Sequence, residues 1–244
     1  MTVDPDSSLT PPEGLLRACH ALRIGVARAA WDQIGRYLAR LLDANQHMNL
    51  TAVRDPEEAW NRHVLDSLSL LPFLGGAGRI IDVGSGGGLP GMILALARPD
   101  LQVTLLEATG KKCRFLEETI SALSLRGVRV LSLRAEAAGR DPDHRERYDL
   151  AVARGLASLN VLIEYTVPLV RVGGRVLALK GTAAEDEVGT ATAALQALGS
   201  EVVAAHDALP GVIDHARIVE IVKRQPTPEA YPRRDGVPSK RPLR

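Results

Sequence analysis

The stretch Ile81-Asp-Val-Gly84-Ser-Gly86-Gly-Gly88-Leu-Pro-Gly91 decides the fold class of this 244-residue chain. It follows a β-branched run and precedes a helix-like segment expected to begin near Leu89. Glycines in such a turn permit positive φ and close approach of a ligand to backbone N–H groups, and a helix N-terminus favours an anionic group. The stretch therefore predicts a ligand-binding turn, although dinucleotide enzymes use similar turns and a tight turn without a ligand can look the same.

Short apolar runs alternate with helix-like segments on the C-terminal side of this turn. The predicted strands are 79–83, 102–107, 128–133, 149–153, 174–179, 201–205 and 216–223. Apolar strands separated by helical segments indicate a mostly parallel sheet with helices on both faces. Only a loop separates the last two strands, so we expect them to form an antiparallel edge, because a parallel return needs about a dozen residues or more. This is the outline of a seven-stranded class I (Rossmann-like) methyltransferase sheet.

The N-terminal part of the chain is predicted to be helical. Apolar residues spaced from Trp31 to Leu42 indicate one amphipathic helix. Asp55 as N-cap, followed by Pro56, begins a second helix that is expected to reach about Leu71 and to leave Arg62, His63 and Asp66 on the surface. A polar connector is expected over 45–51. We therefore divide the chain into a helical cap (1–74), a methyltransferase domain (75–224) and a basic, proline-rich tail (225–244).

Composition narrows the possible partners. With 30 Lys and Arg against 29 Asp and Glu, the net charge is +1, so a polyanionic partner must be met by a local patch. Cys19 and Cys113 lack metal-ligand spacing and are expected to be buried, with no disulfide and no metal site. No apolar run is long enough for a membrane helix, and no signal segment is evident. We expect a cytoplasmic monomer that does not bind membranes.

Two acidic residues stand at the carboxyl ends of predicted neighbouring strands. Asp82 lies within the glycine-rich motif and Glu107 ends the second strand, where an acid can hold ribose hydroxyls. A dinucleotide site would normally read G-x-G-x-x-G/A, so the motif bordered by Asp82 better suits S-adenosylmethionine. The cluster Arg134-Ala135-Glu136 follows the third strand and is either a further ligand contact or a helix cap.

Two basic residues end the fourth and fifth strands. Arg154 can hold a carboxylate or phosphate with both arms of its guanidinium, unless it is an ordinary solvated arginine, and Lys180 adds a second cation at the same edge. Two cations favour a polyanionic substrate. We assign Arg154 and Lys180 to the catalytic site, where they would bind and orient the reactants without transferring a proton.

Missing motifs restrict the chemistry. No Asn/Asp-Pro-Pro-aromatic loop follows Val152, as adenine amino methylation commonly needs, and neither Cys19 nor Cys113 is placed as the nucleophile for methylation of cytosine carbon. Guanine N7 has an exposed lone pair and no proton to remove, so its methylation requires alignment and charge stabilisation only. A site without an evident base fits this acceptor.

Five separate segments, in order, resemble the bacterial 16S ribosomal RNA guanine-N7 methyltransferases, the glucose-inhibited division protein B family, also called methyltransferase G. They are Asn49-Leu-Thr-Ala-Val-Arg54, His63-x-x-Asp66-Ser67, Asp82 to Gly91, Arg154-Gly-Leu-Ala-Ser-Leu159 and Ala178-Leu-Lys-Gly181. The segment from Tyr231 to Leu243 is similar to a C-terminal signature in one branch of that family.

The resemblance implies S-adenosylmethionine as cofactor and a guanine in the decoding-region loop of 16S rRNA, or of an assembling small subunit, as substrate. With the motif residues, the expected cofactor site comprises Asp82, Gly84, Gly86, Gly88, Leu89, Glu107, Ala108, Thr109, Ala135, Glu136 and Arg154. The cap and tail are expected to serve RNA and to stay apart from the cofactor, through Asn49, Arg62, His63, Arg233, Arg234, Lys240 and Arg241. A small-molecule methyltransferase, a dinucleotide-binding reductase and a non-catalytic RNA-binding adaptor are the alternatives.

Overall fold

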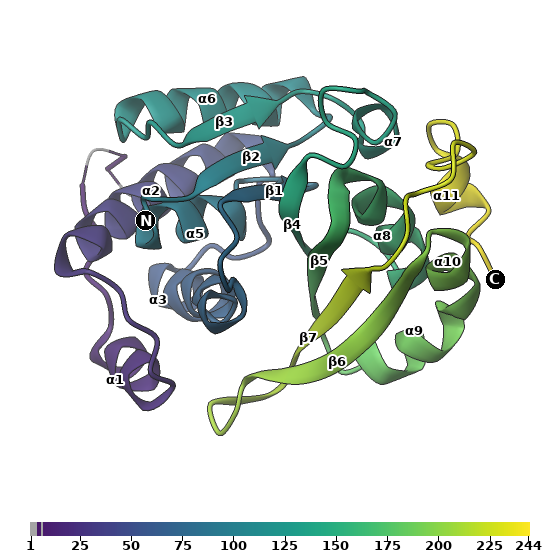
Figure 1. The fold of residues 1–244 in the computed structure, drawn as a ribbon. Coiled ribbons are helices and arrows are strands. Elements are labelled where there is room, and N and C mark those ends of the chain that lie inside the picture. The colour runs from purple at the N-terminus through teal and green to yellow at the C-terminus, as the bar shows by residue number, and fades with distance from the viewer. Residues whose placement is uncertain (1–3, 6) are drawn as a thin grey trace.

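The structure is a computed structural model that describes residues 4, 5 and 7–244, with the backbone alone for 213–215. Its central element is a seven-stranded sheet. The strand order is β3-β2-β1-β4-β5-β7-β6 (Figure 1). The strands are β1 (Arg79–Val83), β2 (Gln102–Leu106), β3 (Val128–Leu131), β4 (Tyr148–Arg154), β5 (Val170–Lys180), β6 (Ser200–Leu209) and β7 (Ile213–Lys223). All neighbours are parallel except β7, which is antiparallel to β5 and β6. The predicted fold class and antiparallel edge are confirmed.

Helices cover both faces of the sheet because the strands are apolar on both faces. Ile80 and Ile81, neighbours in β1, belong to two different buried apolar clusters. Helices α5 (Gly91–Ala97) and α6 (Gly110–Ala122) contact strands from one side, together with the N-terminal helices. The other cluster packs beneath helix α8 (Leu159–Thr166) and its neighbours, which are α7 (Ala135–Ala138), α9 (Ala184–Thr190) and α10 (Thr192–Ala197). Because β1 to β5 are parallel, their carboxyl ends all lie at one common edge of the sheet.

The N-terminal helices pack onto the face that carries α5. They are α1 (Glu13–Ala21), α2 (Arg28–Met48), α3 (Pro56–Ala59), a π-helical stretch (Trp60–Leu65) and α4 (Asp66–Leu68). Leu38 and Leu41 of α2 share an apolar cluster with Ile80 of the sheet and Met92 of α5. Asp55 caps α3, accepting a 2.8 Å hydrogen bond from the Glu58 N–H, as predicted. The division of the chain at 74 and 224 stays a prediction.

Three local expectations differ from the structure. Helix α2 extends to Met48, so the connector predicted from residue 45 is shorter and Asn45 is buried. The second helix stops at Leu68 instead of about Leu71 and contains the π-helical stretch. His63 is only 5% exposed, and its predicted place on the surface is wrong. It is buried because the opposite wall comes from β4, which lies 91 residues further along the chain at Arg154.

The C-terminal segment after β7 packs against the helices beside the carboxyl edge instead of extending as a tail (Figure 1). Its short helix α11 (Val237–Lys240) contacts α8. The Arg145 guanidinium donates to the carbonyl oxygens of Thr227 and Tyr231 at 2.6 and 2.8 Å. These bonds hold in place a segment for which the sequence predicts only a basic, proline-rich tail.

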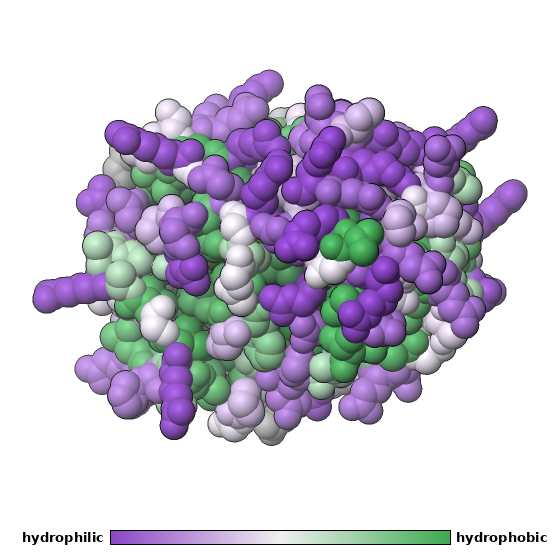
Figure 2. Space-filling model, in the orientation of Figure 1, coloured by the Kyte–Doolittle hydropathy of each residue, from purple (hydrophilic) through white to green (hydrophobic). Residues whose placement is uncertain are grey.

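Surface and core agree with the composition. Hydrophilic side chains cover most of the face in Figure 2, with apolar ones showing mainly in its left half and in a smaller group right of the centre. Cys19 and Cys113 are buried free thiols, as expected. Within the described residues, no helix has the length and apolar character that a membrane span requires.

Candidate active site

The glycine-rich turn between β1 and α5 forms one wall of a cavity at the carboxyl edge. Gly84, Gly86 and Gly88 all have positive φ, at 72°, 58° and 103°. Asp82 braces the turn from inside the protein: its carboxylate Oδ2 accepts a 2.8 Å hydrogen bond from the Gly91 N–H. Burial raises the pKa of the Asp82 carboxyl to about 7. Asp82 therefore supports the turn and does not line the cavity, whereas Gly84 and Gly86 do.

Glu107, directly after β2, faces the same cavity and is tied to the turn. Its Oε2 accepts from the Gly86 N–H at 3.0 Å and its Oε1 accepts from the Thr109 N–H at 2.8 Å. A carboxylate offers about four acceptor positions, so two remain for a ligand. A pair of neighbouring acceptor positions matches the two hydroxyls of a ribose.

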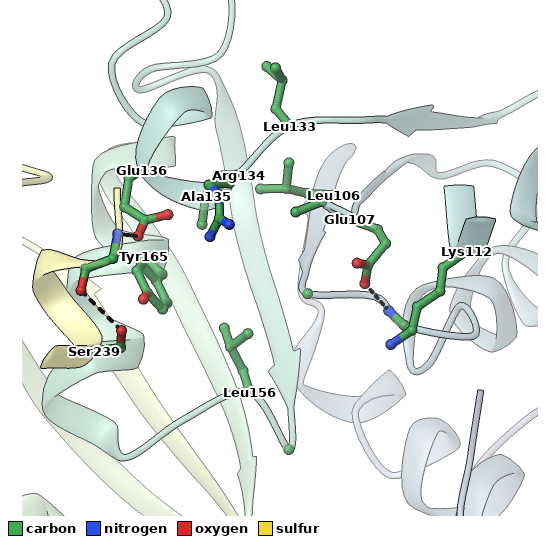
Figure 3. Close-up of a pocket in the computed structure, with 15 residues that line it drawn as sticks. Leu106, Glu107, Lys112, Leu133, Arg134, Ala135, Glu136, Leu156, Tyr165 and Ser239 are labelled. Carbon is green, nitrogen blue, oxygen red and sulfur yellow. Dashed lines mark hydrogen bonds between the residues drawn. The ribbon is translucent and has the colours of Figure 1, made fainter. Parts of the chain in front are cut away.

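We call this cavity the nucleoside pocket; its volume is about 310 Å³, at the small end of the range for ligand sites. In Figure 3, Glu107 and Lys112 lie on one side, with Glu136, Tyr165 and Ser239 on the other. The lining residues are Gly84, Gly86, Leu106, Glu107, Ala108, Lys112, Leu133, Arg134, Ala135, Glu136, Gly155, Leu156, Tyr165, Gly236 and Ser239.

The C-terminal segment completes the nucleoside pocket. The Gly236 N–H donates to Glu136 Oε1 at 2.8 Å, which joins α11 to α7 across the cavity wall. Arg233 holds the same segment to α8 through Glu164, with Nη2 to Oε2 at 2.7 Å and Nε to Oε1 at 2.9 Å. The expectation that the tail stays apart from the cofactor site is therefore wrong. The positive charge of Arg233 is also paired with a buried carboxylate.

A second cavity, of about 490 Å³, opens beside the first between the N-terminal helices and the ends of β4 and β5. We call it the rim pocket. Gly155, immediately after β4, lines both cavities, so the two are adjacent. The rim pocket is lined by Thr51, Ala52, Val53, Arg62, His63, Asp66, Arg154, Gly155, Leu179, Lys180, Gly181, Glu187 and Ala216.

Arg154 points into the rim pocket and away from the nucleoside pocket. Its Nη1 donates to the Arg62 carbonyl oxygen at 2.7 Å, its Nη2 lies 3.2 Å from His63 Nδ1, and Asp66 is 3.8 Å from Nη1. Burial, reinforced by the Arg154 charge, lowers the pKa of the His63 imidazole to about 4. His63 is therefore neutral near pH 7 and does not supply the positive charge predicted for it.

Lys180 also lines the rim pocket, but its ammonium group is engaged by the protein. Nζ lies 2.7 Å from Glu187 Oε2 and donates to the Ala157 carbonyl oxygen at 2.7 Å. The Lys180 side chain is 10% exposed. Since Glu187 Oε2 also accepts from the Leu159 N–H at 2.6 Å, this ion pair anchors the loop that carries Gly155.

The structure brings together part of the predicted cofactor set. Gly84, Gly86, Glu107, Ala108, Ala135 and Glu136 line the nucleoside pocket, whereas Asp82, Gly88, Leu89, Thr109 and Arg154 are not among its lining residues. The residues that line this pocket and were not predicted as site residues are Leu106, Lys112, Leu133, Gly155, Leu156, Tyr165, Gly236 and Ser239. Gly155, next to Arg154 at a strand end, carried a usable signal. The tail residues carried none, because only long-range packing brings them here.

The residues expected to contact RNA lie in two places. Arg62 lines the rim pocket and pairs with Glu58 at 2.8 Å, and exposed Asn49 ends α2. Arg234, Lys240 and Arg241 are exposed on the C-terminal segment. Within the described residues, no group of three or more His, Cys, Asp or Glu side chains is placed to hold a metal ion.

Replacing Glu107 by alanine is expected to weaken S-adenosylmethionine binding by about 1–3 kcal/mol, because the ribose hydroxyls would lose a charged acceptor when they are buried in the pocket. Isothermal calorimetry measures the change. Glu117→Ala, which removes an exposed acid from α6, is the matched control and should bind normally. Unchanged affinity in the Glu107 variant would move the nucleoside contact elsewhere.

The lowered His63 pKa gives a pH-dependent stability. Between pH 6.5 and 4 the unfolded chain binds a proton at His63 that the folded chain does not, so the His63 contribution is present above pH 6.5 and is lost as the pH falls to 4. Relative to His63→Gln, the wild type should lose about 3 kcal/mol of unfolding free energy over this window. Urea denaturation at each pH measures the difference, and other titrating groups cancel because both proteins contain them. A constant difference would contradict the lowered pKa.

Similarity to known proteins agrees with the ligand-binding site described above. A family model described as "GidB: rRNA small subunit methyltransferase G" matches residues 30–212. Proteins named ribosomal RNA small subunit methyltransferase G are similar over most of this chain. The one from Roseiflexus castenholzii is 45% identical over 231 residues, covering 94% of this chain and 98% of its own. The one from Moorella thermoacetica is 46% identical over 213 residues, covering 86% and 89%.

Solved structures share the fold at low sequence identity. The ribosomal protein L11 methylase from Lactobacillus delbrueckii subsp. bulgaricus aligns with a TM-score of 0.51 and 16% identity, over 70% of this chain and 81% of its own. Geranyl diphosphate C-methyltransferase from Streptomyces coelicolor aligns with a TM-score of 0.51 and 14% identity, over 64% and 78%. The predicted methyltransferase class and S-adenosylmethionine cofactor are confirmed by the family match, and the chain belongs to the rRNA small subunit methyltransferase G family.

Proposed function

We propose that this protein transfers the methyl group of S-adenosylmethionine to N7 of a guanine in the decoding-region loop of 16S rRNA, acting as a monomer. One observation carries the proposal: the nucleoside pocket and the rim pocket meet at Gly155. A donor held in the first cavity and a base held in the second would face each other across a residue without a side chain.

The residues of the nucleoside pocket fit the cofactor. Glu107 has two free acceptor positions for ribose hydroxyls, and Gly84 and Gly86 present backbone where a side chain would intrude. The carboxylates of Glu107 and Glu136 also favour a cationic ligand such as a sulfonium. When bound, S-adenosylmethionine supplies an electrophilic methyl group. The chain's own residues then have to hold and orient the two reactants and exclude water.

Among the described residues that line the rim pocket, each side chain that could accept a proton is already engaged: Asp66 and His63 by Arg154, and Glu187 by Lys180. This agrees with an acceptor that carries no proton to remove. His63, with its pKa near 4, stays neutral, and its Nδ1 already accepts from Arg154. Alignment of N7 with the methyl group is then the main contribution of the protein. Arg154 holds the pocket wall in place and presents its remaining N–H groups to acceptors of the RNA.

RNA would reach the rim pocket across the edge that carries Asn49 and Arg62 on one side and Arg234 and Lys240 on the other. All four residues are exposed, and contacts from the three cations to phosphate would be weakened by salt. The substrate in this proposal is 16S rRNA, free or within an assembling small subunit.

Mapping of methyl incorporation tests the function directly. Ribosomal RNA and small-subunit particles from a strain lacking this enzyme would be incubated with labelled S-adenosylmethionine, and the labelled nucleotide identified by mass spectrometry. We expect one guanine of the decoding-region loop to be labelled at N7. Particles from the parent strain are the control and should accept no label. Label on another atom, or on small molecules only, would refute the proposal.

A further inference from the structure

Thr51 lies in the wall of the rim pocket on a loop that the protein holds rigidly. The buried Asn45 side chain accepts from the Leu50 and Thr51 N–H groups at 2.7 and 2.9 Å, and donates to the Val53 carbonyl oxygen at 3.2 Å. These three bonds fix the backbone on both sides of Thr51. Its hydroxyl therefore has a defined position at the pocket surface.

The neighbouring histidine has a defined tautomer. Arg154 can only donate, so His63 Nδ1, 3.2 Å from Arg154 Nη2, must be an acceptor without a hydrogen. The hydrogen of the neutral ring is then on Nε2, which lies 2.7 Å from Thr51 Oγ1. His63 consequently donates to the threonine hydroxyl.

The Thr51 hydroxyl can act towards a ligand only as a hydrogen-bond donor. Its oxygen accepts from His63 Nε2 and also from the Val53 N–H at 3.0 Å, which occupies both lone pairs. Among the described residues, no oxygen or nitrogen lies within hydrogen-bonding distance to accept the hydrogen of this hydroxyl. The hydroxyl is thus a donor only, with its hydrogen free for a ligand in the rim pocket.

We propose that the Thr51 hydroxyl donates to O6 of the substrate guanine and thereby selects guanine over adenine. This inference rests on the proposed function. The N7 edge of guanine presents two acceptors, N7 and O6, whereas that of adenine presents N7 and an amino donor. N7 must keep its lone pair for the methyl group, so O6 is the acceptor left for the protein to bind. A hydroxyl whose lone pairs are filled cannot accept from the adenine amino group, and the two donors would oppose each other.

The test compares two RNAs that carry either guanine or 2-aminopurine at the target position. 2-Aminopurine keeps N7 and lacks O6. Single-turnover rates with saturating S-adenosylmethionine give the guanine preference of each enzyme. We expect Thr51→Val to reduce this preference about tenfold, the factor that corresponds to 1.4 kcal/mol, and Thr51→Ser to restore it.

A structural role alone would slow both RNAs equally and leave the preference unchanged, which would overturn the inference. Ser67→Ala is the matched control: it removes a hydroxyl that donates to the His63 carbonyl oxygen at 2.6 Å behind the pocket, and should keep the wild-type preference. If Thr51→Val does not fold, the wild type alone still decides, because equal rates on both RNAs contradict an O6 contact. Failure of the proposed function is distinct, since the wild type would then leave N7 of the guanine RNA unmethylated.

Discussion

Replacing Arg233 by alanine should destabilise the protein by about 3–5 kcal/mol, because it leaves a buried carboxylate without its partner. The Glu164 side chain is 1% exposed and pairs with Arg233 Nη2 at 2.7 Å, while the Arg233 side chain is 25% exposed. The Arg233 backbone N–H still donates to Glu164 Oε1 at 2.8 Å in the variant, but it carries no compensating charge. Urea denaturation monitored by circular dichroism measures the loss.

The adjacent arginine provides the control for this experiment. Arg234 is exposed, and Arg234→Ala should change the free energy of unfolding by no more than about 0.5 kcal/mol. Both variants lose one positive charge from the same segment, so the comparison separates the buried ion pair from the net charge. Equal, small effects would show that the Arg233 to Glu164 contact contributes little. We also expect the Arg233 variant to bind the cofactor more weakly than the wild type. Arg233 joins the C-terminal segment to α8, and Ser239 of that segment and Tyr165 of α8 both line the nucleoside pocket.

Replacing Gly84 by valine should lower the affinity for S-adenosylmethionine by at least about a hundredfold. Gly84 has a φ of 72°, which a β-branched residue adopts only with strain, and a Cβ at this position would collide with the Leu156 side chain in the pocket wall. Unfolding free energy should fall as well, by about 1–3 kcal/mol. Calorimetric titration with the cofactor gives the affinity.

Gly110→Val is the matched substitution for the Gly84 experiment. A Cβ at Gly110 meets no atom within 4 Å, and Gly110 lies outside both pockets. This variant should fold and bind the cofactor normally. Normal affinity in a folded Gly84 variant would instead remove the glycine-rich turn from the binding site.

Local patterns in the sequence were sufficient for the sheet, the glycine-rich turn and the acid at the end of β2. Each of these depends on residues close together in the chain: strand periodicity, turn chemistry and the strand end that presents Glu107. The antiparallel edge was equally predictable, because too few residues separate β6 from β7 for a parallel return.

Errors arose where distant segments decide the environment of a side chain. His63 belongs to a helix whose periodicity places it outside the apolar stripe, yet Arg154 and Thr51 cover it in the folded protein. Lys180 ends a strand at the predicted edge, but Glu187 neutralises it from the following helix. Charge counts in the sequence therefore overstated the positive charge available to RNA at the rim.

Completion of the nucleoside pocket by Gly236 and Ser239 affects when a newly made chain becomes active. Synthesis proceeds from the N-terminus, so all seven strands and the glycine-rich turn emerge from the ribosome before the segment that closes the pocket. A chain that ends after Arg233 but before Gly236, through a premature stop codon or a protease, would keep the sheet and the ion pair between Arg233 and Glu164 and would lack one wall of the site. We expect such a fragment to fold and to bind the cofactor weakly.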